Sequence, residues 1–145
     1  MFARLLRVLA APRPTPLPAP DEKLALGALM VHIAKSDRHY DVAEIRRIDR
    51  LLARLYHLGP VEAAKMRATC EKLEHAAPDS DRFGHLIREA VPHETRQAAL
   101  AALWEVVLSD GATPPPREVH VLEAARAAMG LSEADSEAAR ARAEG

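Results

Sequence analysis

Two segments of the chain repeat one apolar helical pattern and end on the same Ser-Asp pair, and this repeat constrains the fold most. KLALGALMVHIAKSD occupies residues 23–37 and RQAALAALWEVVLSD occupies residues 96–110, so the two align without a gap at a separation of 73 positions. Their apolar residues recur at three- and four-residue spacing, which is typical of a helix rather than a strand. We therefore expect a related helix at the start of each half.

A second helical pattern follows each Ser-Asp pair at a matching distance. EIRRIDRLLARLYHL covers residues 44–58 and EVHVLEAARAAMGL covers residues 118–131. The first pattern has an apolar stripe, formed by Ile45, Ile48, Leu52 and Leu55. The repeat thus predicts two pseudo-repeated helical hairpins, each with an acidic corner.

Prolines and capping residues divide the rest of the chain into further helices. Pro60 is placed to start a helix that Pro78 ends. The next helix has Asp79 or Ser80 as its N-cap and is closed by Pro92. Near the C-terminus, a Ser and an Asp three residues apart have the pattern of a capping box (Ser132 and Asp135).

Composition agrees with one all-α domain. The 145 residues are 48% hydrophobic but only 3% aromatic, so the core is expected to consist of Leu, Ala, Val, Ile and Met. The single cysteine, Cys70, excludes an intramolecular disulfide and fits a reducing compartment. No apolar run approaches the roughly 20 residues of a membrane-spanning helix, and a net charge of −1 argues against a nucleic-acid partner. We expect a single compact domain of about seven or eight helices.

The first 20 residues have a different character from residues 21–145. A short amphipathic helix is predicted there, followed by prolines at every second position that form an extended tether. The segment could pack back on the domain or lack structure, or it could bind a membrane surface or a partner protein. The apolar residues of its helix would make that contact: Phe2, Leu5, Leu6 and Leu9.

The first acidic corner has two interpretations. Asp41 is a favoured N-cap and Glu44 stands three residues later, as a capping box requires, while Asp37 would help to end the preceding helix. Alternatively, these three carboxylates could approach one cation from both sides of the corner, and oxygen ligands suit Ca²⁺ or Mg²⁺. The spacing differs from that of an EF-hand loop.

The apolar helix, the D-x-x-x-D-x-x-E corner, the second helix and the later copy together resemble the tellurite-resistance TerB family. The resemblance covers about residues 21–131, and ETRQAALAALWEVVLSDG is particularly similar to the family's second repeat. It implies an all-helical fold, a possible metal site at Asp37, Asp41 and Glu44, and a cytoplasmic interaction module linked to tellurite resistance and stress response. Its partners would be other proteins, and peripheral contact with the inner membrane would use the N-terminal helix.

Both corners depart from the family pattern. The first has Asp37 followed by Arg38 where Asp-Gly is usual, and the bulky residues after Asp37 make a tight turn harder to form. The second keeps Asp110 before Gly111, but ATPPPRE replaces the expected second Asp. Only Glu118 follows nearby, so Asp110 and Glu118 are the remaining metal-ligand candidates of the second corner.

Other side chains have simple structural interpretations. Cys70 is expected to be a structural thiol and Trp104 a core or helix-interface residue. His32 is expected to be partly buried and could contact Glu105, which occupies the matching place in the second repeat. A row of arginines could form a solvated face or meet an anionic partner (Arg46, Arg50 and Arg54).

The sequence therefore predicts a non-enzymatic module, because no nucleophile or substrate pocket is evident. The alternative function is a metal-free scaffold or adaptor whose N-terminal helix binds a membrane surface or partner. An enzyme that uses the acidic corner for metal-assisted chemistry is a third class.

Overall fold

The structure is a computed structural model that describes residues 17–38, 40–109 and 113–145. Within these ranges it contains seven helices and no strand, which confirms the all-α prediction. The N-terminal helix predicted from Phe2, Leu5, Leu6 and Leu9 lies outside the described residues. The helices are α2 (Glu22–Lys35), α3 (Val42–Tyr56), α4 (Pro60–Ala76), α5 (Ser80–Ala90), α6 (His93–Val107), α7 (Pro116–Ala128) and α8 (Glu133–Glu144).

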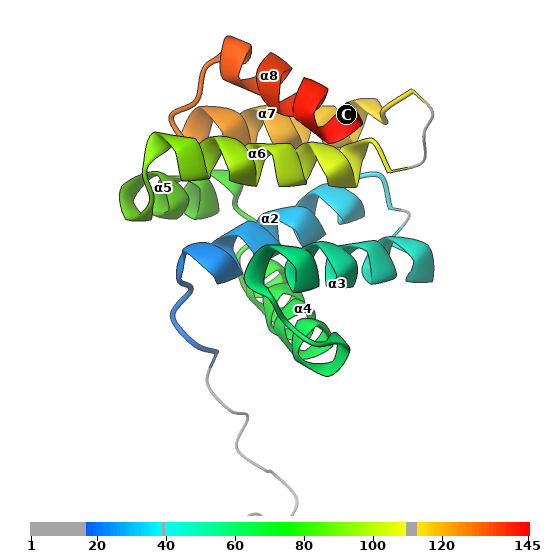
Figure 1. Cartoon of the computed structure of the whole chain (residues 1–145). Helices are drawn as coiled ribbons and strands as arrows, with labels where there is room; N and C mark the ends of the chain where they lie inside the picture. Colours follow the sequence, from blue (N-terminus) through cyan, green and yellow to red (C-terminus); the bar gives the residue numbers. More distant parts are fainter. Residues whose placement is uncertain (1–16, 39, 110–112) are drawn as a thin grey trace, which may run out of the picture.

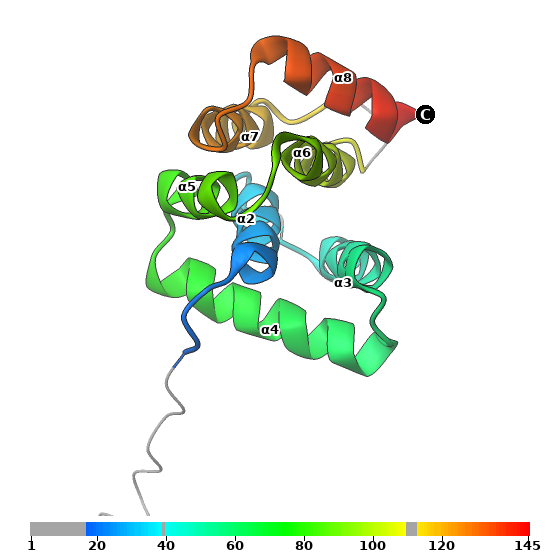
Figure 2. The same ribbon diagram turned by 60° about the vertical axis from the view of Figure 1, so that its left-hand side comes forward.

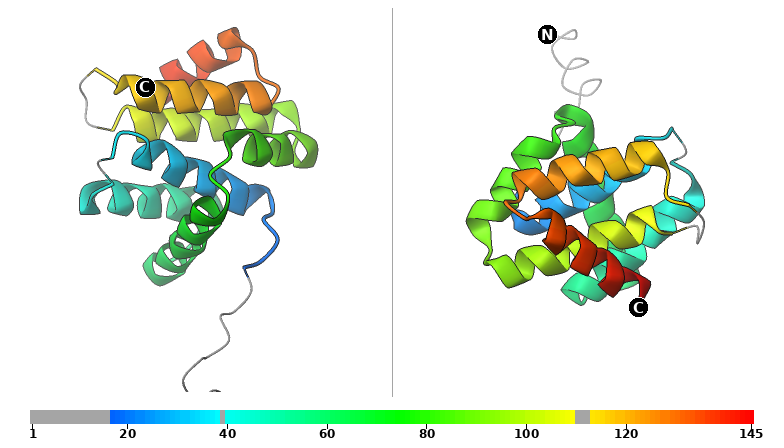
Figure 3. Two further views of the ribbon diagram at one scale, coloured as in Figure 1. Left: turned by 180° about the vertical axis from the view of Figure 1, so that it is seen from behind. Right: turned by 90° about the horizontal axis from the view of Figure 1, so that it is seen from above.

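Helix α2 is the centre of the domain, because it contacts α3, α4, α5, α6 and α7. In Figure 1 it lies between α3 and α4 below and α6 and α7 above. Figure 2 shows α4 crossing beneath α2, and Figure 3 shows α8 lying over the α6–α7 layer. The two hairpins, α2–α3 and α6–α7, thus belong to one compact domain, and the five helices that contact α2 surround it.

The two apolar repeat helices are buried on nearly all sides. Nine residues of α2 and eight of α6 are buried, so these helices supply much of the core. α3 is instead amphipathic and buries a single stripe that includes Ile48, Leu51 and Leu52. Of the four residues of the predicted apolar stripe, Ile48 and Leu52 are therefore buried, whereas Ile45 and Leu55 are half-buried.

Local sequence signals place the helix ends. Pro60 occupies the first turn of α4, and the Asp79 side chain caps α5 by accepting from two backbone N–H groups. Pro92 follows the end of α5 and is itself the N-cap residue of α6. At the start of α8, Ser132 and Asp135 form the predicted reciprocal capping box.

A close approach of α2 and α4 depends on Gly27. A Cβ atom at this position would lie 2.3 Å from Sγ of Cys70, which is far inside van der Waals contact. The Cys70 thiol is fully buried and donates a weak 3.6 Å hydrogen bond to the Leu24 carbonyl. Cys70 is therefore the structural thiol that the sequence predicts, and Gly27 is small because the thiol fills the space beside it.

Candidate functional site

The corner between α2 and α3 is a tight turn built around a residue in the left-handed conformation. Ser36 ends α2 and donates its hydroxyl to the Ile33 carbonyl at 2.7 Å. Arg38 then adopts φ 68°, a region that glycine occupies at much lower cost. The turn therefore forms without a glycine. Arg38 adopts the backbone conformation that suits the Gly of the family's Asp-Gly pattern.

The predicted acidic residues of this corner have different environments. Asp41 is exposed, and its Oδ1 accepts a 3.0 Å hydrogen bond from the Glu44 backbone N–H, so its predicted role as an N-cap is confirmed. Glu44 lies in the first turn of α3, and Asp37 lies in the turn before it; both are half-buried. Across the described ranges, no group of three or more Asp, Glu, His or Cys side chains is arranged to hold a metal ion.

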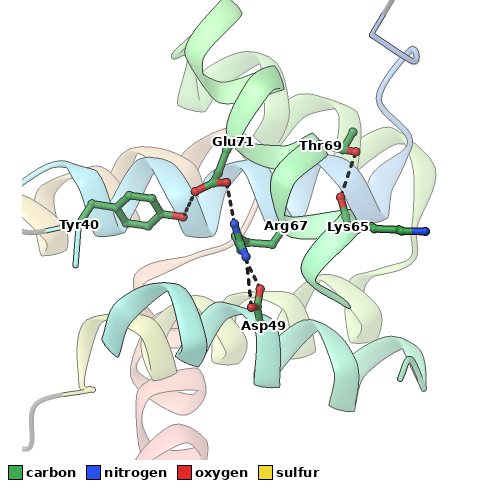
Figure 4. Close-up of polar contacts among 6 residues, drawn as sticks. All are labelled: Tyr40, Asp49, Lys65, Arg67, Thr69 and Glu71. Atoms are coloured by element: carbon green, nitrogen blue, oxygen red, sulfur yellow. Dashed lines mark hydrogen bonds and ion pairs between the residues drawn. The ribbon is translucent and has the colours of Figure 1, made fainter. Parts of the chain in front are cut away.

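A chain of polar contacts braces the corner against α4 (Figure 4). The Tyr40 hydroxyl donates to Glu71 Oε2 at 2.7 Å, and Arg67 Nη1 donates to Glu71 Oε1 at 2.9 Å. The same guanidinium donates through Nε to Asp49 Oδ1 of α3 at 2.9 Å. One carboxylate on α4 thus ties the corner to an arginine that also holds α3.

Burial and charge shift the pKa values of this network. Burial of the Tyr40 phenol raises its pKa well above the usual range, and its hydrogen bond to the Glu71 carboxylate adds to the shift. The pKa of Arg67 is raised chiefly by its hydrogen bond to Asp49, and also by that to Glu71. The phenol therefore stays neutral and the guanidinium stays charged at physiological pH, as the hydrogen bonds require.

A second carboxylate of α4 holds the end of α2. Glu74 is only 3% exposed and accepts a 2.6 Å hydrogen bond from Lys35 Nζ. Its other oxygen lies 3.4 Å from Nδ1 of His32. The possible His32–Glu105 contact is therefore not formed, because His32 faces α4 while Glu105 pairs with Arg54 of α3.

These contacts show which site residues the sequence missed. Glu71 and Glu74 look like ordinary surface acids of a helix, yet both are central to the corner. Arg67 and Glu71 are four residues apart, so their pairing could be found from sequence alone. Tyr40 is 31 residues from Glu71, so that hydrogen bond depends on how α4 crosses the corner.

The second corner does not copy the first. Asp110 lies outside the described residues, and Glu118 is a buried residue in the first turn of α7, 4% exposed. The N-cap residue of α7 is Pro115, which has no side-chain hydrogen bond to offer. The capping carboxylate of the first corner therefore has no counterpart at Pro115.

Trp104 connects α6 to α8, as expected of a residue at a helix interface. It is buried and donates its indole N–H to Ser136 Oγ at 3.0 Å. The Arg140 guanidinium lies over the ring, 5.1 Å from its centroid. These contacts fix α8 on α6 (Figure 3).

The described residues form an all-helical module with a braced corner between its first two helices. The family model described as "Tellurite resistance protein TerB" matches residues 23–141, and the chain belongs to that family. The match extends beyond the residues that suggested the resemblance and includes most of α8. TerB is not a known family of enzymes.

Two further comparisons give no additional relative. Neither the curated proteins nor the solved structures include a match to this chain. In the part of the chain that the structure describes, no helix is both long and apolar enough to cross a membrane.

Proposed function

We propose that the protein is a non-catalytic interaction module of the TerB family that works with partner proteins in tellurite resistance and stress response in the cytoplasm. The observation that carries this proposal is the use of carboxylates at the corner. Glu71 is engaged by Tyr40 and Arg67, and Glu74 by Lys35 and His32. Their contacts hold helices together, which suits a rigid surface for binding.

Growth of a host strain that lacks the gene for this protein tests the proposed link to tellurite resistance. Wild-type protein should restore growth on tellurite, and an empty vector should not. Equal growth of both strains would contradict the tellurite link. Turnover of a substrate by the purified protein that disappears in Asp37→Asn would instead make it an enzyme.

A second candidate function is a divalent-cation response at the same corner, through Asp37, Asp41 and Glu44. It is favoured by the exposure of Asp41, whose N-cap hydrogen bond uses only Oδ1. A Ca²⁺ or Mg²⁺ ion there would also need backbone carbonyls and water as ligands. Asp110 and Glu118 remain a weaker proposal for the second corner, and the burial of Glu118 restricts access to it.

Calorimetric titration with Ca²⁺ and with Mg²⁺ shows whether the carboxylates of this corner bind a cation or only cap α3. The test variant is Asp37→Asn/Asp41→Asn, because Asn also caps helices and should preserve α3. The matched control is Asp21→Asn, since Asp21 caps α2 with the same geometry, at 2.8 Å to Leu24 N. Binding lost only in the double variant would support a cation site, whereas no binding at millimolar ion would leave the metal-free adaptor.

The N-terminal segment supplies a separate proposal for localisation. Phe2, Leu5, Leu6 and Leu9 would form the apolar face of a helix that contacts a partner or the inner membrane surface. Deletion of residues 1–20 should abolish sedimentation with anionic vesicles if the membrane is the target. Unchanged sedimentation after the deletion would contradict it.

A further inference from the structure

The outer surface of α3 lies between two hollows that share one arginine. The first hollow, of about 390 Å³, is lined by Arg47, Arg50 and Arg54 of α3 together with residues of α6 and α8. The second hollow, of about 310 Å³, lies where α3 meets the start of α4. Arg50 lines both, so a single extended ligand could occupy the two hollows together.

The first hollow carries an excess of positive charge. Among the described residues, Glu105 is the only acid that lines it, and it pairs with Arg54. Nη1 of Arg47 is buried without a hydrogen-bond partner, and Arg50 is exposed with no carboxylate within ion-pair distance among the described residues. The exposed Arg50 guanidinium is therefore available for an anionic group of a ligand, which binds arginine strongly, and Arg47 adds a second positive charge to the same wall.

The second hollow is mainly apolar. Its walls include Ala53, Leu58, Pro60 and Ala63, and the one acid that lines it in the described part of the chain, Asp49, is already held by Arg67. An apolar side chain would gain burial here without displacing an ion pair.

We propose that the outer face of α3 binds an acidic amphipathic helical segment of a partner protein. Acidic side chains of that segment would meet Arg47 and Arg50, and an apolar side chain one or two turns away would enter the second hollow. Charge excludes this chain's own N-terminal segment, because residues 1–16 carry Arg4, Arg7 and Arg13 and no acid. This inference rests on the proposed interaction function and names the chemistry of the partner.

Fluorescence anisotropy with a labelled synthetic peptide tests the surface. The probe is a Glu/Leu peptide of about 15 residues, roughly four helical turns, with leucines at three- and four-residue spacing. The test variant of the full chain is Arg47→Glu/Arg50→Glu. The matched control is Arg82→Glu, an exposed arginine of α5, which lies away from α3 in Figures 1 and 2.

We expect the wild type and Arg82→Glu to bind the peptide equally and the double variant to bind at least about tenfold more weakly. Affinity should fall with added salt, and replacement of the leucines by serine should also weaken binding. Arg50→Ala alone, which removes one charge without reversing it, should give a smaller loss in the same direction. Circular dichroism confirms that each variant remains folded.

Two results would overturn the inference. One is equal peptide binding by the wild type and the double variant, or no binding by either. The other is binding of a single-stranded oligonucleotide as tightly as the Glu/Leu peptide, since the surface would then be a general polyanion site. Restored growth on tellurite together with either result would leave the proposed role in tellurite resistance intact and remove only this surface.

Discussion

The Tyr40 hydroxyl donates a 2.7 Å hydrogen bond to Glu71, and this contact joins the α2–α3 corner to the middle of α4. Because Glu71 also accepts from Arg67, which holds Asp49 of α3, the contact belongs to a chain that spans three elements (Figure 4). The corner is therefore positioned by α4 as well as by its own turn.

Replacement of Tyr40 by Phe should lower the free energy of unfolding by about 1–2 kcal/mol, because a half-buried hydrogen bond to a carboxylate is lost. Urea denaturation measures the change. Tyr56→Phe is the matched control, since Tyr56 is also half-buried but its hydroxyl has no hydrogen-bond partner among the described residues. Equal stability of wild type and Tyr40→Phe would show that the corner does not depend on this bond.

Replacement of Arg38 by Gly should make the protein more stable than Arg38→Ala by about 1 kcal/mol. The reason is the φ of 68°, which Gly adopts without the steric cost that any Cβ imposes. Thermal unfolding of the two variants gives the comparison. A more stable Ala variant would mean that Arg38 does not hold this conformation in solution.

Replacement of Gly27 by Ala should destabilise the protein by about 1–3 kcal/mol, because the new Cβ would overlap Sγ of Cys70. In a Cys70→Ala background the nearest remaining atom is Cβ of residue 70, at 3.4 Å, so the same change should cost much less. A double-mutant cycle measured in urea gives the coupling. Additive effects would contradict the close packing of α2 on α4.

Stability should decrease in alkaline solution through the Cys70 thiol. Burial raises its pKa from the ordinary 9.0 to about 12, with smaller contributions from Asp21 and Glu71. The folded state thus keeps a proton that the unfolded chain releases, so this stabilisation is complete below pH 9 and declines as the pH rises from 9 towards 12. Relative to Cys70→Ala, the wild type should lose stability over that window, and parallel pH profiles would contradict the assignment.

The sequence predicts the parts of the fold that depend on local spacing. Burial of α2 and α6 follows from their apolar repeats, and the caps at Asp41 and Ser132 follow from side chains that reach only three residues along the chain. The partners of Glu74 and Glu105 depend on helix crossing angles, which periodicity does not encode. For that reason the sequence allows a His32–Glu105 contact and does not indicate the His32–Glu74 contact that forms.

Much of the candidate site also depends on tertiary structure. The arginine row of α3 is visible in the sequence, but the neighbours that make hollows beside it come from α4, α6 and α8. The sequence does not show which arginine of the row has its charge paired. That arginine is Arg54, and its partner Glu105 is 51 residues away.

Crosslinking in the native host tests the central claim, that this is an interaction module that binds partners through α3, most directly. Tagged wild-type protein, Arg82→Glu and Arg47→Glu/Arg50→Glu would be crosslinked in cells, and the captured proteins would be compared by mass spectrometry. We predict that the first two capture the same protein, with an acidic amphipathic segment at the crosslinked site, and that the double variant loses it. Capture of the same protein by all three variants would contradict binding through α3.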